Sequence, residues 1–414
     1  MTASPPAPAR APLKPLDEAL AELLAFAAPL ARRDVVSTFE ADGRVLAQEV
    51  SSALQVPPQD NSSMDGYALR CADAGNELPV SQRIPAGSFG SPLKAGTAAR
   101  IFTGAPVPEG ADAIVMQEDC ETVEVDGHAH IRVKAQPQPG QWIRRAGEDV
   151  MQGAVVLPQG SRLDPAALGL AASIGLAQLS VVGKPRVALF STGDELVMPG
   201  DVPPEHMPPG AIYNSNRFFL RALLLRLGCE VTDLGIVPDK LDATVAALKD
   251  ASQHHDLILT SGGVSVGEED HIKPAVQSLG QLSLWQIAMK PGKPFAYGRV
   301  GASHFIGLPG NPVSSFVTFM LLVRPFLLKL QGAATLAPPA QALTAQFSWG
   351  RPDKRREFLR VRRTANGGVE LFPNQSSGVL TSAVWGDGVV DNPPGRAIAP
   401  GDSVQFISFA ELMS

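Results

Sequence analysis

The chain has 414 residues, which is too long for a single hydrophobic core and predicts about two to four domains. With 44% hydrophobic and 18% charged residues, its composition is that of a folded, water-soluble protein rather than a disordered or membrane protein. The formal net charge of -6 argues against a nucleic-acid partner, because duplex binding needs a concentrated basic surface.

The cysteines and the first apolar segment indicate a cytoplasmic protein. Cys71, Cys120 and Cys229 lie far apart, without the spacing of a zinc site or a disulfide framework. The apolar run at 20–31 follows acidic residues and is too short to span a membrane. We therefore expect neither a signal peptide nor a membrane anchor there.

The first 182 residues predict a tail and two modules. Residues 1–12 are mostly Ala and Pro and are expected to be a disordered tail, whereas the spacing of Leu16, Leu20 and Leu23 predicts a helix. Between 54 and 141, Pro and Gly interrupt short apolar runs, such as 99–103 and 113–116, as is typical of a small β module. We expect residues 142–182, with an apolar helix at 165–176, to complete a helical and β module begun by residues 13–53.

Residues 183–332 alternate between strands and helices, which predicts a doubly wound α/β module. The predicted strands are 186–190, 230–236, 257–259 and 304–308, and the predicted helices are 215–227, 243–251 and 313–330. After a linker rich in Pro and Ala, residues 333–414 contain short alternating runs at 357–363, 369–372 and 403–408. These runs predict a small β-barrel or sandwich, so the whole chain is expected to be multidomain α/β plus β.

Two loops that follow predicted strands carry small and acidic residues. Strand 186–190 runs into 191–195, and strand 257–259 runs into 260–270. Ligands of open parallel sheets bind beyond the carboxyl ends of the strands, where glycines let backbone N–H groups approach a phosphate. A single Gly-Gly loop would serve a tight turn equally well.

Two further turns belong to the same unit. The segment 309–312 (PGNP) joins a strand to a helix, and Asn311 and Pro312 suit a helix start, which by itself needs no function. Lys290 and Lys293 flank a Pro-Gly turn, where phosphate binding competes with the commoner interpretation of an exposed basic turn. Carboxylates and lysines at one sheet edge would together form a site for Mg²⁺ and phosphates.

Six motifs, taken in order, resemble those of the molybdopterin molybdenumtransferase family, to which the C-terminal part of gephyrin also belongs. They lie at 60–68 (DNSSMDGYA), 102–108 (FTGAPVP), 191–196, 260–270, 290–294 and 307–313. The resemblance implies an elongated homodimer with a helical and β N-terminal module, an inserted β module, a molybdopterin-binding α/β module and a C-terminal β-barrel. It also implies a cleft between the α/β module of one subunit and the β module of the other, so that Asp60 and Thr103 would act in trans.

The resemblance implies roles for individual residues. The catalytic set would be Asp60, Thr103, Glu195, Asp270 and Lys290, and the metal ligands would be Glu195, Asp239 and Asp270. Molybdopterin, phosphate or molybdate would be bound by Ser261, Gly262, Gly263, Ser265, Gly267, Lys293, Pro309, Gly310, Asn311, Pro312, Arg360 and Ser377. One position departs from the family: Gln286 stands where Lys or Arg is common, which removes a cation from the anion site.

The implied reaction inserts molybdenum into adenylated molybdopterin. Molybdate would attack the pyrophosphate-linked substrate and AMP would leave, while Mg²⁺ and lysines would neutralise the growing phosphate charge. One alternative function is that of a molybdopterin adenylyltransferase, which shares the Ser-Gly-Gly loop, but the extra modules oppose this alternative. A separate adenylyltransferase could also be a partner protein. The other alternative is a non-catalytic molybdopterin-binding scaffold, which would not need the charged pocket.

Overall fold

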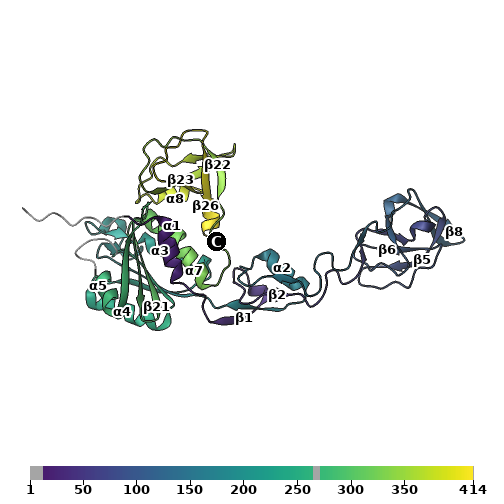
Figure 1. The fold of residues 1–414 in the computed structure, drawn as a ribbon, viewed down its shortest axis with the longest axis horizontal. Coiled ribbons are helices and arrows are strands. Elements are labelled where there is room, and N and C mark those ends of the chain that lie inside the picture. Colours follow the sequence, from purple (N-terminus) through teal and green to yellow (C-terminus); the bar gives the residue numbers. More distant parts are fainter. Residues whose placement is uncertain (1–12, 264–270, 414) are drawn as a thin grey trace, which may run out of the picture.

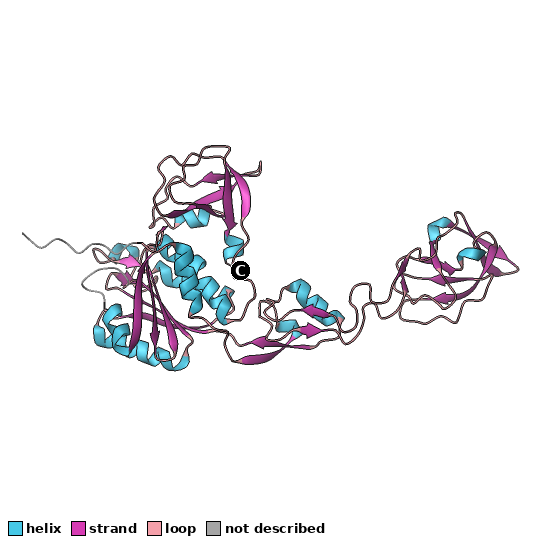
Figure 2. Cartoon of the chain, in the orientation of Figure 1, coloured by secondary structure: helices cyan, strands magenta, loops and turns pink. Residues whose placement is uncertain are grey.

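The computed structural model describes residues 13–263 and 271–413, which form an elongated chain (Figure 1). An α/β unit and a barrel lie at one end, a β domain lies at the other, and a smaller unit connects them. Figure 2 shows that most helices belong to the α/β end, whereas the far end is mainly strands. The multidomain α/β plus β fold expected from the sequence is confirmed.

The connecting unit is built from two antiparallel strand pairs and one helix. Strands β1 (Arg33–Ser37) and β12 (Gln178–Val182) form one pair, and β2 (Val50–Ser51) and β11 (Val155–Leu157) form the other. Helix α2 (Pro165–Ser173) begins where the Asp164 carboxylate accepts a hydrogen bond from the Ala167 amide, and Pro165 occupies its first turn. A small core that includes Leu46, Leu163 and Val181 holds these elements together.

The far β domain is inserted into that unit through a connection of two antiparallel segments of the chain, in which β3 (Asn61–Ser62) pairs with β10 (Ile143–Arg144). Its sheet has the strand order β7-β4-β6-β5-β9-β8. The strands are β4 (Gly66–Leu69), β5 (Glu77–Ile84), β6 (Ala98–Ile101), β7 (Ala113–Met116), β8 (Cys120–Val125) and β9 (His128–Val133). Gly66 is required in β4 because a Cβ there would lie 1.9 Å from the Val115 carbonyl oxygen.

The α/β unit contains a six-stranded sheet with the order β16-β13-β17-β21-β20-β18. The parallel strands are β16 (Glu230–Val237), β13 (Arg186–Thr192), β17 (Leu257–Ser261) and β21 (Ser303–Leu308). Strands β20 (Pro294–Val300) and β18 (Gly280–Gln286) continue the sheet in antiparallel fashion. The sequence did not predict β20, so the antiparallel edge of the sheet is a finding of the structure.

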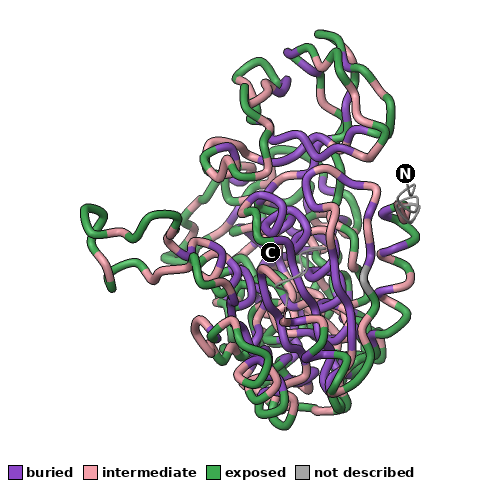
Figure 3. Tube along the Cα trace, turned by 90° about the vertical axis from the view of Figure 1, so that its left-hand side faces the viewer, coloured by how far each residue is buried: buried purple, intermediate pink, exposed green. Residues whose placement is uncertain are grey.

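Helices cover both faces of this sheet, as a doubly wound fold requires. Val187 and Leu189 of β13 pack with α1 (Leu16–Ala25), α3 (Ser215–Arg226), α6 (Pro312–Thr318) and α7 (Arg324–Leu330). The alternate residues Ala188 and Phe190 pack with α4 (Leu241–His254) and α5 (Ile272–Leu279). Alternation along the strand thus sends side chains into two cores, and Figure 3 shows buried residues gathered in this unit.

One helical run in the described residues, Pro312–Leu330, is long and apolar enough to cross a membrane, with a mean hydropathy of 1.6. It comprises α6, a π-helical segment at Phe319–Val323 and α7. Within the protein 89% of this run is buried, as in the core helix of a folded domain.

The C-terminal strands close into a barrel. Strands β22 (Gln341–Ala345), β23 (Arg356–Arg363), β24 (Gly368–Leu371), β25 (Gly388–Asn392) and β26 (Ser403–Ser408) are joined in a ring, because β23 pairs with both β24 and β25. Two short helices, α8 (Thr381–Trp385) and α9 (Phe409–Leu412), accompany the strands. The barrel is tied to the α/β unit by β19 (Met289–Lys290), which pairs with β23 and aligns Lys290 with Glu357.

A buried histidine in the α/β unit is expected to make stability depend on pH. His304 is 8% exposed, its Nδ1 lies 2.9 Å from the Tyr297 hydroxyl, and both ring nitrogens lie 3.1 Å from the Arg299 guanidinium. Burial, together with the charge of Arg299, lowers the pKa of His304 to about 4. An unfolded histidine has a pKa near 6.5, so the unfolded chain takes up a proton first as the pH falls.

We therefore expect the stabilising contribution of neutral His304 to be complete above about pH 6.5 and to be lost progressively as the pH falls toward 4. The loss between pH 7 and 5 should be about 2 kcal/mol. Urea unfolding midpoints across this range would measure it, with His304→Gln as the comparison, since Gln does not titrate. An identical pH dependence in the variant would show that His304 is not responsible.

Candidate active site

A pocket of about 400 Å³ opens at the carboxyl ends of the parallel strands. The residues that line it include the loop ends after β13, β17 and β21 and the start of α3. The lining includes seven of the site residues that the sequence predicted: Glu195, Ser261, Gly262, Pro309, Gly310, Asn311 and Pro312. The structure thus brings together three loops that are far apart in the sequence, at the sheet edge where parallel α/β proteins bind ligands.

Glycine at two positions allows the loops to approach each other. Gly193 has φ +138°, and a Cβ there would lie 2.5 Å from Oε2 of Glu195. Gly262 has φ +91°, and a Cβ there would lie 3.1 Å from the Thr192 carbonyl oxygen. Larger residues would therefore displace the Glu195 carboxylate or separate the loops after β13 and β17.

Two asparagines at the start of α3 also line the pocket, and sequence reasoning missed both. The Asn214 side-chain oxygen accepts a hydrogen bond from the Arg217 amide, and the Asn216 side-chain nitrogen donates one to the Gly310 carbonyl at 2.7 Å. These bonds fix the orientation of both amides. Nδ2 of Asn214 and Oδ1 of Asn216 are buried and have no hydrogen-bond partner in the part of the chain that the structure describes. The only sequence signal was a helix-start asparagine, which has a purely structural explanation.

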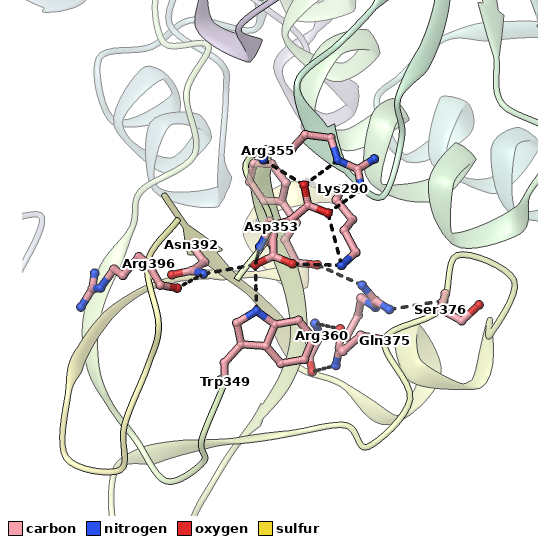
Figure 4. Close-up of polar contacts among 11 residues, drawn as sticks. Lys290, Trp349, Asp353, Arg355, Arg360, Gln375, Ser376, Asn392 and Arg396 are labelled. Atoms are coloured by element: carbon pink, nitrogen blue, oxygen red, sulfur yellow. Dashed lines mark hydrogen bonds and ion pairs between the residues drawn. The ribbon is translucent and has the colours of Figure 1, made fainter. Parts of the chain in front are cut away.

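Lys290 lies at the junction between the α/β unit and the barrel, where carboxylates already hold it (Figure 4). Its ammonium group is 3.1 Å from Oε1 of Glu357 and 3.7 Å from Oδ2 of Asp353. The Glu357 side chain is 1% exposed, and its Oε2 accepts hydrogen bonds from the Trp349 indole at 2.8 Å and the Asp353 amide at 3.2 Å. The sequence did not indicate this long-range counter-ion, which neutralises part of the Lys290 charge.

Arg360 is the buried cation of this junction and is 1% exposed. Its guanidinium donates only to neutral oxygens, namely Ser382 Oγ at 3.2 Å, the Phe358 carbonyl at 3.0 Å and the Ser376 carbonyl at 3.4 Å. No carboxylate of the described residues forms an ion pair with it. Burial lowers the pKa of Arg360 to about 10, so the group remains charged at neutral pH.

The barrel loop that holds Arg360 meets the pocket loop of the α/β unit. The amide of Val313, next to Pro312, donates to the carbonyl of Ser377 at 2.9 Å. A second contact lies near the lysines, because Pro294, which directly follows Lys293 in the sequence, also lines the pocket. The side chain of Lys293 makes no ion pair among the described residues. Pocket and cationic junction are therefore adjoining parts of one region.

Asp60 and Thr103 lie elsewhere, in and beside the far β domain, and one chain does not bring them to the pocket (Figure 1). The Thr103 amide and hydroxyl both donate to Oδ1 of Asp65, at 2.8 and 2.7 Å. The Thr103 amide, with its hydroxyl, lowers the pKa of Asp65. Sequence reasoning missed Asp65 as the partner of Thr103, although it belongs to the same quoted motif at 60–68.

The remaining predicted residues do not line the described pocket. Asp239 follows β16 at the same sheet edge and is half-buried, and Gly263 follows Gly262. Ser265, Gly267 and Asp270 lie outside the described residues. Gln286 ends β18 opposite Pro294. Within residues 13–263 and 271–413, no three His, Cys, Asp or Glu side chains are grouped as a metal site.

Comparisons with known proteins match nearly the whole chain. Residues 14–175 match the model of the MoeA N-terminal region (domain I and II), 188–329 that of a probable molybdopterin binding domain, and 342–409 that of the MoeA C-terminal region (domain IV). A molybdopterin molybdenumtransferase of Haemophilus influenzae is 38% identical over 96% of this chain and 99% of its own length. The chain belongs to the molybdopterin molybdenumtransferase family.

Other members of the molybdopterin molybdenumtransferase family support this assignment. Molybdopterin molybdenumtransferase 2 of Mycobacterium tuberculosis is 38% identical over 83% of this chain and 85% of its own. The crystal structure of the molybdopterin biosynthesis MoeA protein from Pyrococcus horikoshii superposes with a TM-score of 0.83 at 28% identity, covering 96% of this chain and 100% of that one. The fold and the order of the units are therefore those of the family.

Proposed function

We propose that the protein inserts molybdenum into molybdopterin, using adenylated molybdopterin and molybdate as substrates and releasing AMP. The observation that carries this proposal is the buried Arg360 beside the pocket of a molybdenumtransferase fold, a cation to which the described residues offer no carboxylate counter-ion. A buried charge is costly unless an opposite charge compensates it, so an oxyanion at this junction would complete the structure.

The polar floor of the pocket suits a pterin. The pyrimidine edge of a pterin presents a carbonyl acceptor beside N–H donors. Two pocket atoms lack a partner among the described residues, namely an amide donor, Nδ2 of Asn214, and an acceptor, Oδ1 of Asn216. Leaving such groups buried without partners costs about 1–3 kcal/mol each, which a bound pterin edge would recover after a small side-chain adjustment. Ser261, Gly262 and the segment 309–312 would then form the walls around the ring and its phosphate.

The cations of the junction would bind molybdate and the phosphates. Arg360, which donates to the Ser376 carbonyl, and Lys293 supply charges that no carboxylate of the described residues compensates, and Lys290 is held at a fixed place by Glu357. As AMP leaves, negative charge grows on its phosphate, and fixed cations stabilise that charge without having to reorganise. Gln286 supplies no charge at a position that is commonly basic in the family, so we expect weaker oxyanion binding than in relatives with a cation there.

A magnesium ion would bind at the sheet edge beside Glu195. Glu195 lines the pocket, Asp239 lies at the same sheet edge, and Asp270 completes the set that we propose as ligands. Carboxylate oxygens are the ligands that Mg²⁺ prefers, and one or two of them suffice when phosphate oxygens complete its shell. Mg²⁺ would neutralise charge on the pyrophosphate. The Glu195 carboxylate can occupy its position because Gly193 has no side chain to displace it.

We also propose a cytoplasmic homodimer in which Thr103 of one subunit reaches the pocket of the other, because a single chain keeps the two apart. A molybdopterin adenylyltransferase would be the natural supplier of the adenylated substrate.

Assay of the purified protein tests the proposed function. With adenylated molybdopterin, molybdate and Mg²⁺, we expect AMP release that requires molybdate and yields a product able to activate a molybdenum-dependent apoenzyme. Consumption of ATP with unadenylated molybdopterin would instead favour the adenylyltransferase. Tight binding of molybdopterin without any product would favour the scaffold.

A further inference from the structure

The two antiparallel segments that connect the far β domain to the rest of the chain are held together by the side chain of Asp60. Its Oδ2 accepts a hydrogen bond from the Arg145 guanidinium at 2.6 Å, and its Oδ1 accepts one from the Ala146 amide at 2.9 Å. Asp60 directly precedes β3 on the outgoing segment of the connection, and Arg145 and Ala146 directly follow β10 on the returning segment. One carboxylate therefore crosslinks the two segments next to the domain.

The backbone of Asp60 is tied to the loop that carries Thr103. The Val107 amide donates to the Asp60 carbonyl at 3.0 Å, and two residues later the Ser62 carbonyl accepts from the Gly104 amide at 2.8 Å. Asp60 thus joins three segments: the outgoing segment, the returning segment and the loop at 102–108. A change in its side-chain contacts would be transmitted to the position of Thr103.

The same contacts make Asp60 poorly suited to act on a substrate directly. Both carboxylate oxygens are already bound, and the bond from the Ala146 amide, together with Arg145, lowers its pKa. A carboxylate stabilised in its ionised form is a weak proton acceptor. The resemblance that placed Asp60 among the catalytic residues supplied its position in a motif but not its contacts.

We propose that Asp60 is a positioning residue, which works with Arg145 as a latch that fixes the orientation of the far β domain and hence of Thr103. This inference rests on the proposed function, in which Thr103 reaches the pocket of a second subunit, and it assigns a role to Arg145. Both side chains are accessible, at 37% and 61%, so the latch is a modest interaction that can be removed without unfolding either unit.

The first test measures orientation without any substrate. Fluorophores on Glu124→Cys of β8 and Lys249→Cys of α4 would report the distance between the far domain and the α/β unit, in labelled chains diluted with unlabelled protein. Selective labelling is possible because the native thiols are buried, and burial raises the pKa of Cys71 and Cys120 to about 11 and of Cys229 to about 12. We expect Asp60→Asn and Arg145→Gln to broaden the distance distribution equally, with unchanged melting temperatures.

Arg132→Gln is the matched control, because Arg132 forms a similar exposed ion pair with Glu77 inside the far domain, away from the connection. It should leave the distribution as in the wild type. An unchanged distribution in both latch variants would overturn the proposal, whatever their activity.

The second test uses AMP release. Asn at position 60 can still accept the Ala146 hydrogen bond, so Asp60→Asn removes mainly the contact with Arg145. We expect Asp60→Asn and Arg145→Gln each to lower the rate about three- to fivefold, as suits an exposed ion pair, with the double variant no slower than the slower single one. Arg145→Lys should recover most of the loss, and Arg132→Gln should have no effect.

A hundredfold loss in Asp60→Asn beside normal activity in Arg145→Gln would show instead that Asp60 touches the reactants. If the wild-type protein released no AMP, the proposed function would fail, and the distance measurement would still decide the latch.

Discussion

Replacing Arg360 with methionine is expected to weaken molybdate binding strongly while leaving the barrel folded. Methionine matches the unbranched stem of arginine but lacks the guanidinium group and its charge. A charge pair about 4 Å apart is worth about 4 kcal/mol at an effective dielectric of 20. Affinity should therefore fall by a hundredfold or more. Stability should stay equal or rise, because a buried guanidinium with only neutral partners is replaced by an apolar side chain.

Calorimetric titration with molybdate and a thermal scan would measure both effects. Arg362→Met provides the control on the same strand, since Arg362 is exposed and pairs with Glu370 at 2.5 Å. Unchanged affinity in Arg360→Met would show that Arg360 is structural only. A collapse of the melting temperature together with affinity would mean that the guanidinium supports the barrel through its three hydrogen bonds.

Mixing two inactive variants should restore activity if the active site is shared between subunits. Thr103→Ala and Glu195→Gln should each inactivate both sites of their own homodimers. In a mixed dimer, one site combines both mutations and the other contains neither. Equal mixing makes about half of the dimers mixed, each with one working site of two, so activity should recover to about a quarter of the wild-type value.

The mixture would be prepared by denaturing and refolding the variants together, with subunit exchange verified by mass tags. Each variant refolded alone is the control. If activity does not return although the subunits have exchanged, then either Thr103 and Glu195 act in a site within one chain, or Thr103 is not part of the active site.

Local sequence patterns predicted the α/β unit well because its elements are specified by short-range chemistry. The strand at 257–259 and the helix at 215–227 lie within one or two residues of β17 and α3. Asn311 and Pro312 correctly predicted the start of α6. Strand β20 was missed because it begins at a proline and contains Gly298 and Arg299, which weaken the apolar pattern of a buried strand.

The site was harder to predict wherever it depends on contacts between distant segments. The glycines and the segment 309–312 were recognisable as loops at a sheet edge, and the structure gathers most of them around one pocket. Nothing in the neighbourhood of Lys290 indicates that Glu357 faces it, since that pairing is created by the register of β19 against β23. The partners of Asp60 and Thr103 depend likewise on the closure of the connection and of the 102–108 loop.

The antiparallel pairing of β1 with β12 has a consequence for the order of folding during synthesis. Val35 pairs with Ser180, so the connecting unit cannot close until the ribosome has made everything in between, including the entire far β domain. Strands β4 to β9 need no residue of the connecting unit for their sheet. The inserted domain can therefore fold first on the nascent chain, and its closely spaced ends then shorten the loop that β1 and β12 must close.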